Sequence, residues 1–281
     1  MTGTRATAGR ARRVVGSRTS PGAPIGEVPN VSELFSLKGR TALVTGTRRG
    51  IGQALAVGLA QAGADLLLVG RTGDLRQTAD LVGAAGGTAE QAALDLADPA
   101  SVPEAAQRLL AGRRIDVLVN NAGAIRREPA LDVDYARWRQ VLAVNLDSAF
   151  LLARACGAAM VARGAGKIIT IASLLSFQGG INVVSYTASK HAVAGMTRAL
   201  ANEWGPHGVQ VNAIAPGYIV TDNTRPLREE PGREAAIRER IPAGRWGVPA
   251  DLVGAAVFLA SAASDYVNGY LLAVDGGWLG R

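Results

Sequence analysis

The sequence predicts an α/β protein: one doubly wound domain in which helices cover both faces of a parallel sheet. From Ser36 onward, short apolar runs rich in strand-forming residues alternate with segments of helical length, and some runs, such as 66–69, have no polar face. Alternating strands and helices form right-handed βαβ units. Strands that are apolar on both sides belong in a sheet covered on both faces. The length of 281 residues suits one large domain.

Each element follows from these patterns. The predicted strands are 41–45, 65–69, 88–93, 117–120, 167–171, 209–213 and 271–274, and the predicted helices are 51–61, 75–83, 99–112, 136–162, 183–203 and 249–260. Segment 221–245 breaks the alternation, because it is polar and is interrupted by Pro226, Pro231 and Pro242. It follows a strand end, where ligands bind in such sheets. We expect a mobile substrate lid there; the alternative is an irregular surface insertion.

The positive charge of the chain is concentrated at its start. Of the net charge of +7, residues 1–26 contribute +5 from five arginines and no acid. The basicity therefore belongs to a tail, which argues against nucleic acid as a partner. We expect residues 1–35 to be a disordered extension, with a transit peptide as the alternative, and residues 36–281 to form the domain. No stretch has the apolar length of a secretory signal or a membrane span.

The only cysteine, Cys156, lies in an apolar helical run, which predicts a buried thiol. A single cysteine forms no intramolecular disulfide, so we expect a reducing, cytoplasmic location. The only histidines are His191 and His207, and no Gly-x-Ser-x-Gly turn occurs, which disfavours a serine hydrolase. No cluster of His, Cys and carboxylate residues has metal-ligand spacing, so we expect a metal-free reaction.

A glycine-rich turn joins the first predicted strand to the first helix. It reads Gly46-Thr47-Arg48-Arg49-Gly50-Ile51-Gly52. Glycines let the backbone turn tightly and approach a pyrophosphate, which binds the free N–H groups at the helix start. The turn therefore predicts a dinucleotide site, although a plain strand-to-helix turn has a similar composition.

The end of the second strand bears on the choice of cofactor. An acid there would bind the ribose 2′-hydroxyl of NAD, but the sequence has Arg71 after Gly70. A guanidinium at this position can bind a 2′-phosphate, and Arg49 can add a second charge. NADP(H) is therefore favoured, and NAD(H) is possible if Arg71 is only a solvated loop residue. Asp95 and Leu96 are expected at the adenine.

Tyr186 and Lys190 lie four residues apart in a predicted helix and so share one face. A nearby ammonium group favours the phenolate and brings a phenol toward the working pH of an acid–base catalyst. Ser173, after the fifth strand, can polarise a substrate oxygen, and Asn145 can hold a water near Lys190. Each residue alone has an ordinary structural explanation. Together they predict the interconversion of a carbonyl and an alcohol.

Taken in order, these motifs resemble the short-chain dehydrogenase/reductase family over residues 36–281. The motifs are Thr45-Gly46-x-x-x-Gly50-Ile51-Gly52, Asn120-Asn121-Ala122-Gly123, Asn145, Ser173, Tyr186-x-x-x-Lys190 and Pro216-Gly217. The resemblance implies a Rossmann-type sheet of seven parallel strands, hydride transfer at a nicotinamide, and a homotetramer. It gives catalytic roles to Ser173, Tyr186, Lys190 and Asn145. It also implies cofactor contacts from Asn121, Gly123, Pro216, Gly217, Ile219 and Thr221.

Within the family, segments 171–180, 212–218, 240–247 and 264–270 are similar to members that act on sugar acids, of the 2-deoxy-D-gluconate 3-dehydrogenase (2-dehydro-3-deoxy-D-gluconate 5-dehydrogenase) and gluconate 5-dehydrogenase kinds. A sugar acid needs a cation for its carboxylate and polar partners for its hydroxyls. The candidates are Arg126, Arg127, Gln178, Tyr218 and Arg245, and a solvated basic loop is the alternative. The competing functions are a 3-oxoacyl-carrier-protein-type reductase and a catalytically silent nucleotide-binding regulator.

Overall fold

The computed structural model describes residues 29–281, so most of the expected N-terminal extension lies outside the described residues. Seven parallel strands form one sheet in the order β3-β2-β1-β4-β5-β6-β7. The strands are β1 (Thr41–Thr45), β2 (Asp65–Gly70), β3 (Ala89–Ala93), β4 (Val117–Asn120), β5 (Gly166–Ile171), β6 (Val209–Pro216) and β7 (Leu271–Val274). The predicted doubly wound fold is confirmed. The strand order reverses between β1 and β4, which is where such sheets bind ligands.

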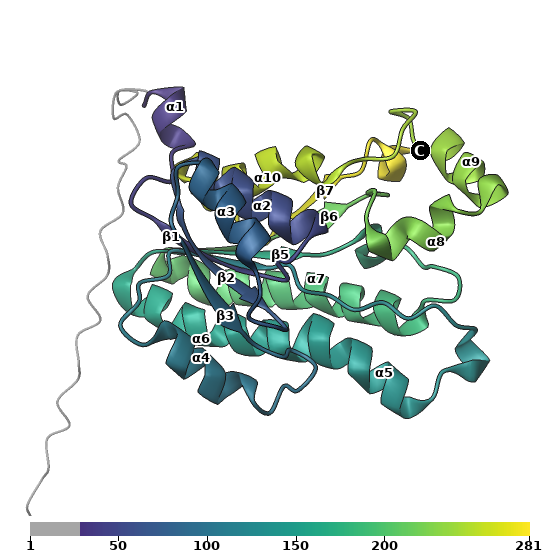
Figure 1. Cartoon of the computed structure of the whole chain (residues 1–281), viewed down its shortest axis with the longest axis horizontal. Coiled ribbons are helices and arrows are strands. Elements are labelled where there is room, and N and C mark those ends of the chain that lie inside the picture. The colour runs from purple at the N-terminus through teal and green to yellow at the C-terminus, as the bar shows by residue number, and fades with distance from the viewer. Residues whose placement is uncertain (1–28) are drawn as a thin grey trace, which may run out of the picture.

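Helices cover the sheet in two layers (Figure 1). Above it in this view lie α2 (Gly50–Gln61), α3 (Arg76–Ala84) and α10 (Val253–Ala260). Below it lie α4 (Val102–Leu110), α5 (Tyr135–Leu142), α6 (Ser148–Arg163) and α7 (Val184–Trp204). The short helices α8 (Arg225–Arg228) and α9 (Pro231–Arg240) stand to one side, beyond the carboxyl ends of β5 and β6.

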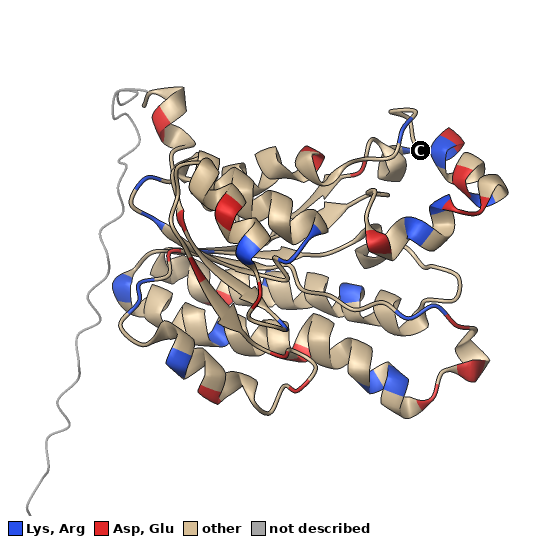
Figure 2. Ribbon diagram, in the orientation of Figure 1, with Lys and Arg blue, Asp and Glu red and all other residues tan. Residues whose placement is uncertain are grey.

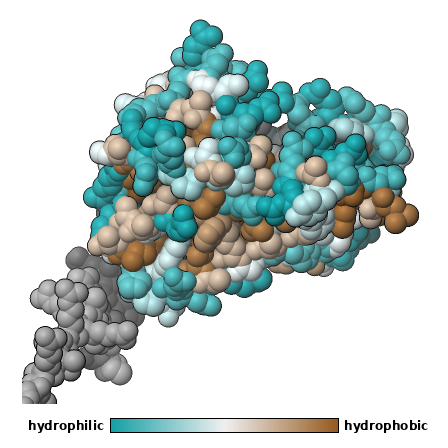
Figure 3. Space-filling view, turned by 90° about the horizontal axis from the view of Figure 1, so that it is seen from below, coloured by the Kyte–Doolittle hydropathy of each residue, from teal (hydrophilic) through white to brown (hydrophobic). Residues whose placement is uncertain are grey.

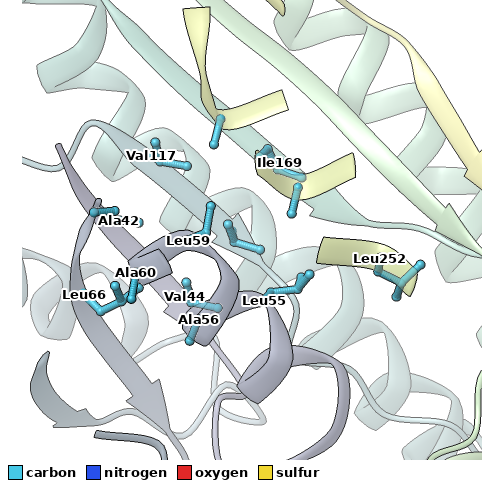
Figure 4. Packing of buried hydrophobic residues seen from close by; sticks show 14 of the residues in the cluster. Ala42, Val44, Leu55, Ala56, Leu59, Ala60, Leu66, Val117, Ile169 and Leu252 are labelled. Atoms are coloured by element: carbon cyan, nitrogen blue, oxygen red, sulfur yellow. The ribbon is translucent and has the colours of Figure 1, made fainter. Parts of the chain in front are cut away.

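The core has two parts because successive strand residues face opposite sides of the sheet. Ala42 and Val44 of β1 pack with Leu55 and Leu59 of α2, as Figure 4 shows. Leu43, between them in sequence, packs on the other face in a second cluster with residues of β2, β4 and α6. Fully burying one leucine stabilises a fold by roughly 1.5–3 kcal/mol, so both layers hold the sheet firmly in place.

One predicted helix differs in detail. Segment 136–162 is not one regular helix, because a π-helical turn (Ala143–Asp147) separates α5 from α6 and contains Asn145. The combined stretch Tyr135–Arg163 is long and apolar enough to cross a membrane, but half of its most apolar window is buried within the fold. It packs on α4, α7 and β5. We therefore assign it to the core of the domain.

The predicted lid, segment 221–245, is more ordered than an irregular insertion. Pro226 and Pro231 lie in the first turns of α8 and α9, where the missing N–H of proline costs no hydrogen bond. The sequence pattern indicates that these prolines interrupt the segment, whereas in the structure they lie where helices begin. Basic and acidic residues are intermixed along α8 and α9 (Figure 2).

The described fold also begins before the expected boundary at residue 36. Asn30 caps a one-turn helix, α1 (Val31–Leu34), by accepting a hydrogen bond from the Ser32 N–H at 3.0 Å. Phe35 packs on Phe258 of α10, with ring centres 6.3 Å apart. Residues 30–35 are therefore attached to the upper helix layer.

Candidate active site

A cleft of about 550 Å³ opens at the carboxyl ends of the central strands. All of the residues predicted to bind the cofactor line it: Gly46, Arg48, Arg49, Gly50, Ile51, Gly52, Arg71, Asp95, Leu96, Asn121, Gly123, Tyr186, Lys190, Pro216, Gly217, Ile219 and Thr221. These residues come from β1, β2, β3, β4, α7 and β6 or the loops that follow them. Their convergence follows from the topology, since parallel strands end at one edge of the sheet.

Close packing makes glycine necessary in the turn after β1. Gly46 and Gly50 have φ values of +71° and +64°, a region that other residues rarely adopt. A Cβ atom on Gly52 would lie 2.3 Å from the Gly46 carbonyl oxygen and 2.4 Å from Asn121 Nδ2. The turn can therefore approach a ligand with bare backbone.

The start of α2 suits a phosphate group. Its N-cap residue, Arg49, has extended backbone and makes no side-chain capping hydrogen bond. The first N–H groups of an uncapped helix point into the cleft as donors, and the helix dipole adds positive potential there. The glycine turn and this helix end therefore fit the pyrophosphate of a dinucleotide.

Three arginines line the adenosine and phosphate part of the cleft. Within residues 29–281, Arg48 and Arg71 form no ion pair. Arg48 lies close enough to Asp74, after β2, to add to the lowering of the pKa of that carboxyl, which Arg76 mainly causes. Arg49 instead pairs with Asp222, with Nη1 and Oδ2 2.8 Å apart. Arg49 thus has an acidic partner in the structure, and its expected role as a second charge for the 2′-phosphate stays a prediction.

The adenine end of the cleft is lined by Asp95 and Leu96. Asp95 Oδ1 accepts a hydrogen bond from the Ala97 N–H at 3.0 Å, which leaves Oδ2 available. The Leu96 side chain is buried, and its carbonyl oxygen accepts a hydrogen bond from Ser148 Oγ. Ala97 and Thr72 also line this end, although the sequence analysis did not single them out.

Asn121 and Asn145 stabilise the backbone around the cleft. Asn121 Nδ2 donates to the carbonyl oxygens of Thr45 at 2.9 Å and Gly46 at 3.2 Å, which joins the ends of β4 and β1. Asn145 accepts from the Ala124 N–H at 2.7 Å and donates to the Ala124 carbonyl and to Ser189 Oγ, each at 2.9 Å. Its side chain is thus held by protein groups, and the expectation that Asn145 holds a water near Lys190 stays a prediction.

Tyr186, Lys190 and Ser173 meet at the inner end of the cleft. Lys190 Nζ lies 5.5 Å from the centre of the Tyr186 ring and donates to the Ile171 carbonyl oxygen at 2.6 Å. Burial lowers the pKa of Lys190 to about 8. Burial raises the pKa of Tyr186, while a hydrogen bond with Ser173 and the charge of Arg127 oppose that rise. Arg127 thus supplies one charge that favours the phenolate, and the ammonium group of Lys190 lies close to the same ring.

The residues predicted to bind the substrate do not lie together in the structure. Arg127 lies near Tyr186 and Tyr218, and partial burial lowers its pKa. Arg126 instead donates to Gln140 Oε1 at 2.8 Å. Arg245 forms two hydrogen bonds with Asp251, at 2.7 and 2.9 Å, and lines a separate cavity of about 240 Å³. The expected role of Arg245 at the substrate is therefore not supported.

Tyr218 and Gln178 belong to an aromatic cluster beside the cleft. The Tyr218 ring packs on Trp246 and Trp278, with ring centres 5.4 and 4.7 Å apart. Gln178 Oε1 accepts from Trp278 Nε1 at 3.4 Å. Sequence analysis missed both tryptophans because they are 32 residues apart along the chain. The available signal was that two of the four tryptophans of an aromatic-poor sequence closely follow the proline-interrupted segment 221–245 and the last predicted strand.

Comparison with known proteins decides the family. The family model described as enoyl-(acyl carrier protein) reductase matches residues 46–279. A 2-dehydro-3-deoxy-D-gluconate 5-dehydrogenase of Bacillus subtilis is 57% identical over 249 residues, covering 89% of this chain and 98% of that protein. The chain belongs to the short-chain dehydrogenase/reductase family. The resemblance seen in the sequence motifs is thereby confirmed.

Solved structures agree with this assignment. A protein of Beutenbergia cavernae, described as an NAD(P)-dependent gluconate 5-dehydrogenase and crystallised with NADP, is 58% identical with a TM-score of 0.87, over 88% of this chain and all of that one. A gluconate 5-dehydrogenase of Burkholderia cenocepacia, in complex with NADP and tartrate, is 41% identical with a TM-score of 0.86, over 90% and 100% of the chains. Both of these proteins were crystallised with NADP, which supports the expectation of NADP(H) as cofactor.

Proposed function

We propose that this enzyme transfers a hydride between NADP(H) and a secondary hydroxyl or ketone of a sugar acid of the gluconate or deoxy-gluconate type. One observation carries the proposal: Arg127 lies close enough to Tyr186, at the inner end of the nucleotide cleft, for its charge to lower the pKa of the phenol. Within residues 29–281 it forms no ion pair. A guanidinium without an acidic partner can bind a substrate carboxylate while the substrate hydroxyl meets the phenol.

The named relatives support this substrate class. They include 2-dehydro-3-deoxy-D-gluconate and gluconate dehydrogenases, and tartrate, the molecule bound to one relative, is itself a hydroxy acid. The carrier-protein reductase alternative has no comparable support from the most similar relatives. The silent-regulator alternative is disfavoured because Ser173, Tyr186 and Lys190 all line the cleft.

The side chains supply the proton chemistry. When bound, NADP(H) supplies or accepts the hydride. In reduction, Tyr186 donates its phenolic proton to the oxygen that develops negative charge, and in oxidation it accepts the proton of the substrate hydroxyl. Ser173 holds the reacting oxygen opposite Tyr186 by hydrogen bonding. Lys190, with a pKa of about 8, exchanges a proton near the working pH and stabilises the phenolate by its charge.

Asn145 acts in this proposal by positioning. Its side chain holds Ala124, in the loop that leads to Arg127, and Ser189, in the helix that carries Tyr186 and Lys190. It therefore fixes the distance between the substrate-binding loop and the catalytic helix.

We further propose that the protein is cytoplasmic and that segment 221–245 is its substrate lid. We also propose that the protein forms a homotetramer. Figure 3 shows hydrophobic residues gathered across the face formed by the lower helices. On that layer, Phe150 of α6 and Val184 of α7 are 38% and 39% exposed. An apolar patch on a helix face is typical of a subunit interface. Light scattering of the purified protein measures the oligomeric state.

An assay of sugar acids with each nicotinamide cofactor tests the substrate proposal. D-Gluconate, 2-deoxy-D-gluconate and 2-dehydro-3-deoxy-D-gluconate are incubated with NADP⁺ and with NAD⁺, and the matching keto acids with NADPH. We expect turnover with at least one of them and a preference for NADP(H). A ketone thioester and uncharged hexoses serve as controls. Turnover of the thioester without any sugar acid would replace the proposal with the carrier-protein reductase.

A further inference from the structure

The loop that carries Arg127 is attached to α5 on both sides of that residue. Arg126 Nη2 donates to Gln140 Oε1 of α5 at 2.8 Å. Glu128 Oε2 accepts from Arg137 Nη1 of the same helix at 2.6 Å. Contacts with one helix at alternate positions are typical of a stretched chain, whose successive side chains point to opposite sides. The side chain of Arg127 is therefore directed away from α5, and its charge acts on the phenol at the inner end of the cleft.

Of these two contacts, the one made by Glu128 is the stronger. The Glu128 side chain is 15% exposed, and its other oxygen, Oε1, is buried with no hydrogen-bond partner in the described part of the chain. A carboxylate with so little access to water depends on its cationic partner. Arg137 is held in turn by Asp134, the N-cap residue of α5, with Nε and Oδ2 3.2 Å apart. The contact of Arg126 with Gln140 is exposed and has a neutral acceptor, so it adds little.

The backbone of Glu128 also joins the loop to the start of α7. Its N–H donates to the Asn182 carbonyl oxygen at 2.9 Å. Asn182 has a φ of +60° and is the one residue other than glycine with a positive φ within residues 29–281, a conformation that asparagine adopts more readily than most residues. Tyr186 lies in the first turn of α7, which packs beside α5 (Figure 1). Glu128 therefore connects the loop to both helices.

We infer that Glu128 is a positioning residue for substrate binding: its attachment to α5 and α7 fixes the loop so that Arg127 meets the substrate carboxylate. The inference rests on the proposed function, in which Arg127 binds that carboxylate. Asn145 holds the beginning of the same loop through Ala124, so Arg127 lies between two fixed points. The Glu128 carboxylate faces α5, on the side of the loop opposite to Arg127, and it therefore acts through that arginine.

A double-mutant cycle between Glu128 and Arg127 tests the inference. Oxidation of the sugar acid is measured for the wild type, Glu128→Ala, Arg127→Gln and the variant with both changes. We expect Glu128→Ala to raise KM about three- to ten-fold, less than the loss of Arg127 itself. It should leave kcat at alkaline pH and NADPH affinity within about two-fold.

The variant with both changes gives the decisive comparison. In the Arg127→Gln background, Glu128→Ala should raise KM no further, because Glu128 acts through Arg127. A further rise in that background would mean that Glu128 meets the substrate independently, which would overturn the inference. An unchanged KM for Glu128→Ala alone would overturn it as well.

Three further variants separate positioning from a loss of folding. Arg137→Ala removes the same contact from the exposed side of α5 and should raise KM as Glu128→Ala does. Glu128→Gln keeps an acceptor for Arg137 and should bring KM to within about three-fold of the wild type. Arg113→Ala breaks an ion pair with Glu90, between the segment after α4 and β3, and should leave KM unchanged. A folded Arg137→Ala variant with the wild-type KM would contradict the inference.

A measurement without substrate distinguishes failure of this inference from failure of the proposed function. The charge of Arg127 lowers the pKa of Tyr186, so release of the loop should leave less phenolate at about pH 10. The absorbance of the tyrosinate, with Tyr186→Phe as the blank, is compared among the cofactor-free wild type, Glu128→Ala and Arg127→Gln. Less phenolate in both variants supports the positioning role even if no sugar acid is oxidised. Unchanged phenolate in Glu128→Ala overturns it even if sugar acids are oxidised.

Discussion

Lys190 Nζ lies 5.5 Å from the centre of the Tyr186 ring and donates to the Ile171 carbonyl oxygen at 2.6 Å. The helical spacing of four residues places both side chains on one face of α7, and the end of β5 supplies the carbonyl group. The ammonium group is therefore anchored to the sheet. This arrangement fixes the phenol of Tyr186 at the inner end of the cleft.

Replacement of Tyr186 by phenylalanine removes the proton donor and keeps the ring. We expect turnover to fall by a factor of about 10²–10⁴, which is the usual contribution of a general acid or base. NADPH affinity, measured by fluorescence titration, should change less than about two-fold, because the hydroxyl is a small part of the cofactor contact. Substantial retained turnover would assign the proton transfer to another group.

Lys190 gives the stability of the protein a pH dependence. Its pKa of about 8 in the fold lies below the 10.5 of an exposed lysine. Between these values the unfolded chain binds more protons, so this residue makes the free energy of unfolding rise with pH. The full difference between the two pKa values corresponds to about 3 kcal/mol in the free energy of unfolding. Below about pH 8 Lys190 is charged in both the folded and the unfolded state, so the folded state bears the full free-energy cost of burying that charge.

Urea denaturation of the cofactor-free wild type and Lys190→Met at several values between about pH 7 and 10 measures this contribution. The wild type should gain stability relative to the variant as the pH rises through this window. Parallel stability curves would show that Lys190 is not held with a lowered pKa. Taking the difference between the two proteins cancels groups such as Lys167, whose pKa burial also lowers.

Arg126 serves as the control for Arg127, because the two residues are adjacent in the sequence and only the charge of Arg127 acts on Tyr186. Arg127→Gln should raise KM for the sugar acid about 10- to 100-fold through loss of a charged hydrogen bond. It should also move the acidic limb of the oxidation profile to higher pH, because oxidation needs the Tyr186 phenolate and the charge of Arg127 lowers the pKa of that phenol. Arg126→Gln should change KM by less than about three-fold. Equal effects would assign the carboxylate elsewhere.

Alanine substitutions at Gly52 and, as a control, at Gly83 test the close packing of the turn. A Cβ atom on Gly52 would lie 2.3 Å from the Gly46 carbonyl oxygen, so Gly52→Ala should distort the turn and weaken NADPH binding at least ten-fold. Gly83, in α3, has no atom within 4 Å of such a Cβ. Gly83→Ala should leave binding unchanged and stabilise the fold by about 0.5–1 kcal/mol. Cofactor titration and thermal unfolding measure the two effects; normal binding by Gly52→Ala would contradict the argument.

Periodicity and composition predicted the sheet and its helices well. The bounds of β1, β4 and β7 agree residue by residue, because short apolar runs flanked by turn residues have few alternative structures. The prediction was weaker at 136–162, where helical periodicity does not reveal a π turn, and at 221–245, where prolines begin helices. Local pattern does not distinguish a proline that ends an element from one that starts it.

The fold class, the cofactor cleft and the spacing of Tyr186 and Lys190 could all be predicted from the amino-acid sequence. These features depend on local pattern and on the common direction of parallel strands. The partners of the arginines emerge only when the chain is folded: the charge of Arg127 acts on Tyr186, Arg245 pairs with Asp251, and Arg49 pairs with Asp222. Long, flexible cations select partners by distance and burial after the chain has folded. Residues far apart in sequence then become neighbours, and no local pattern carries that information.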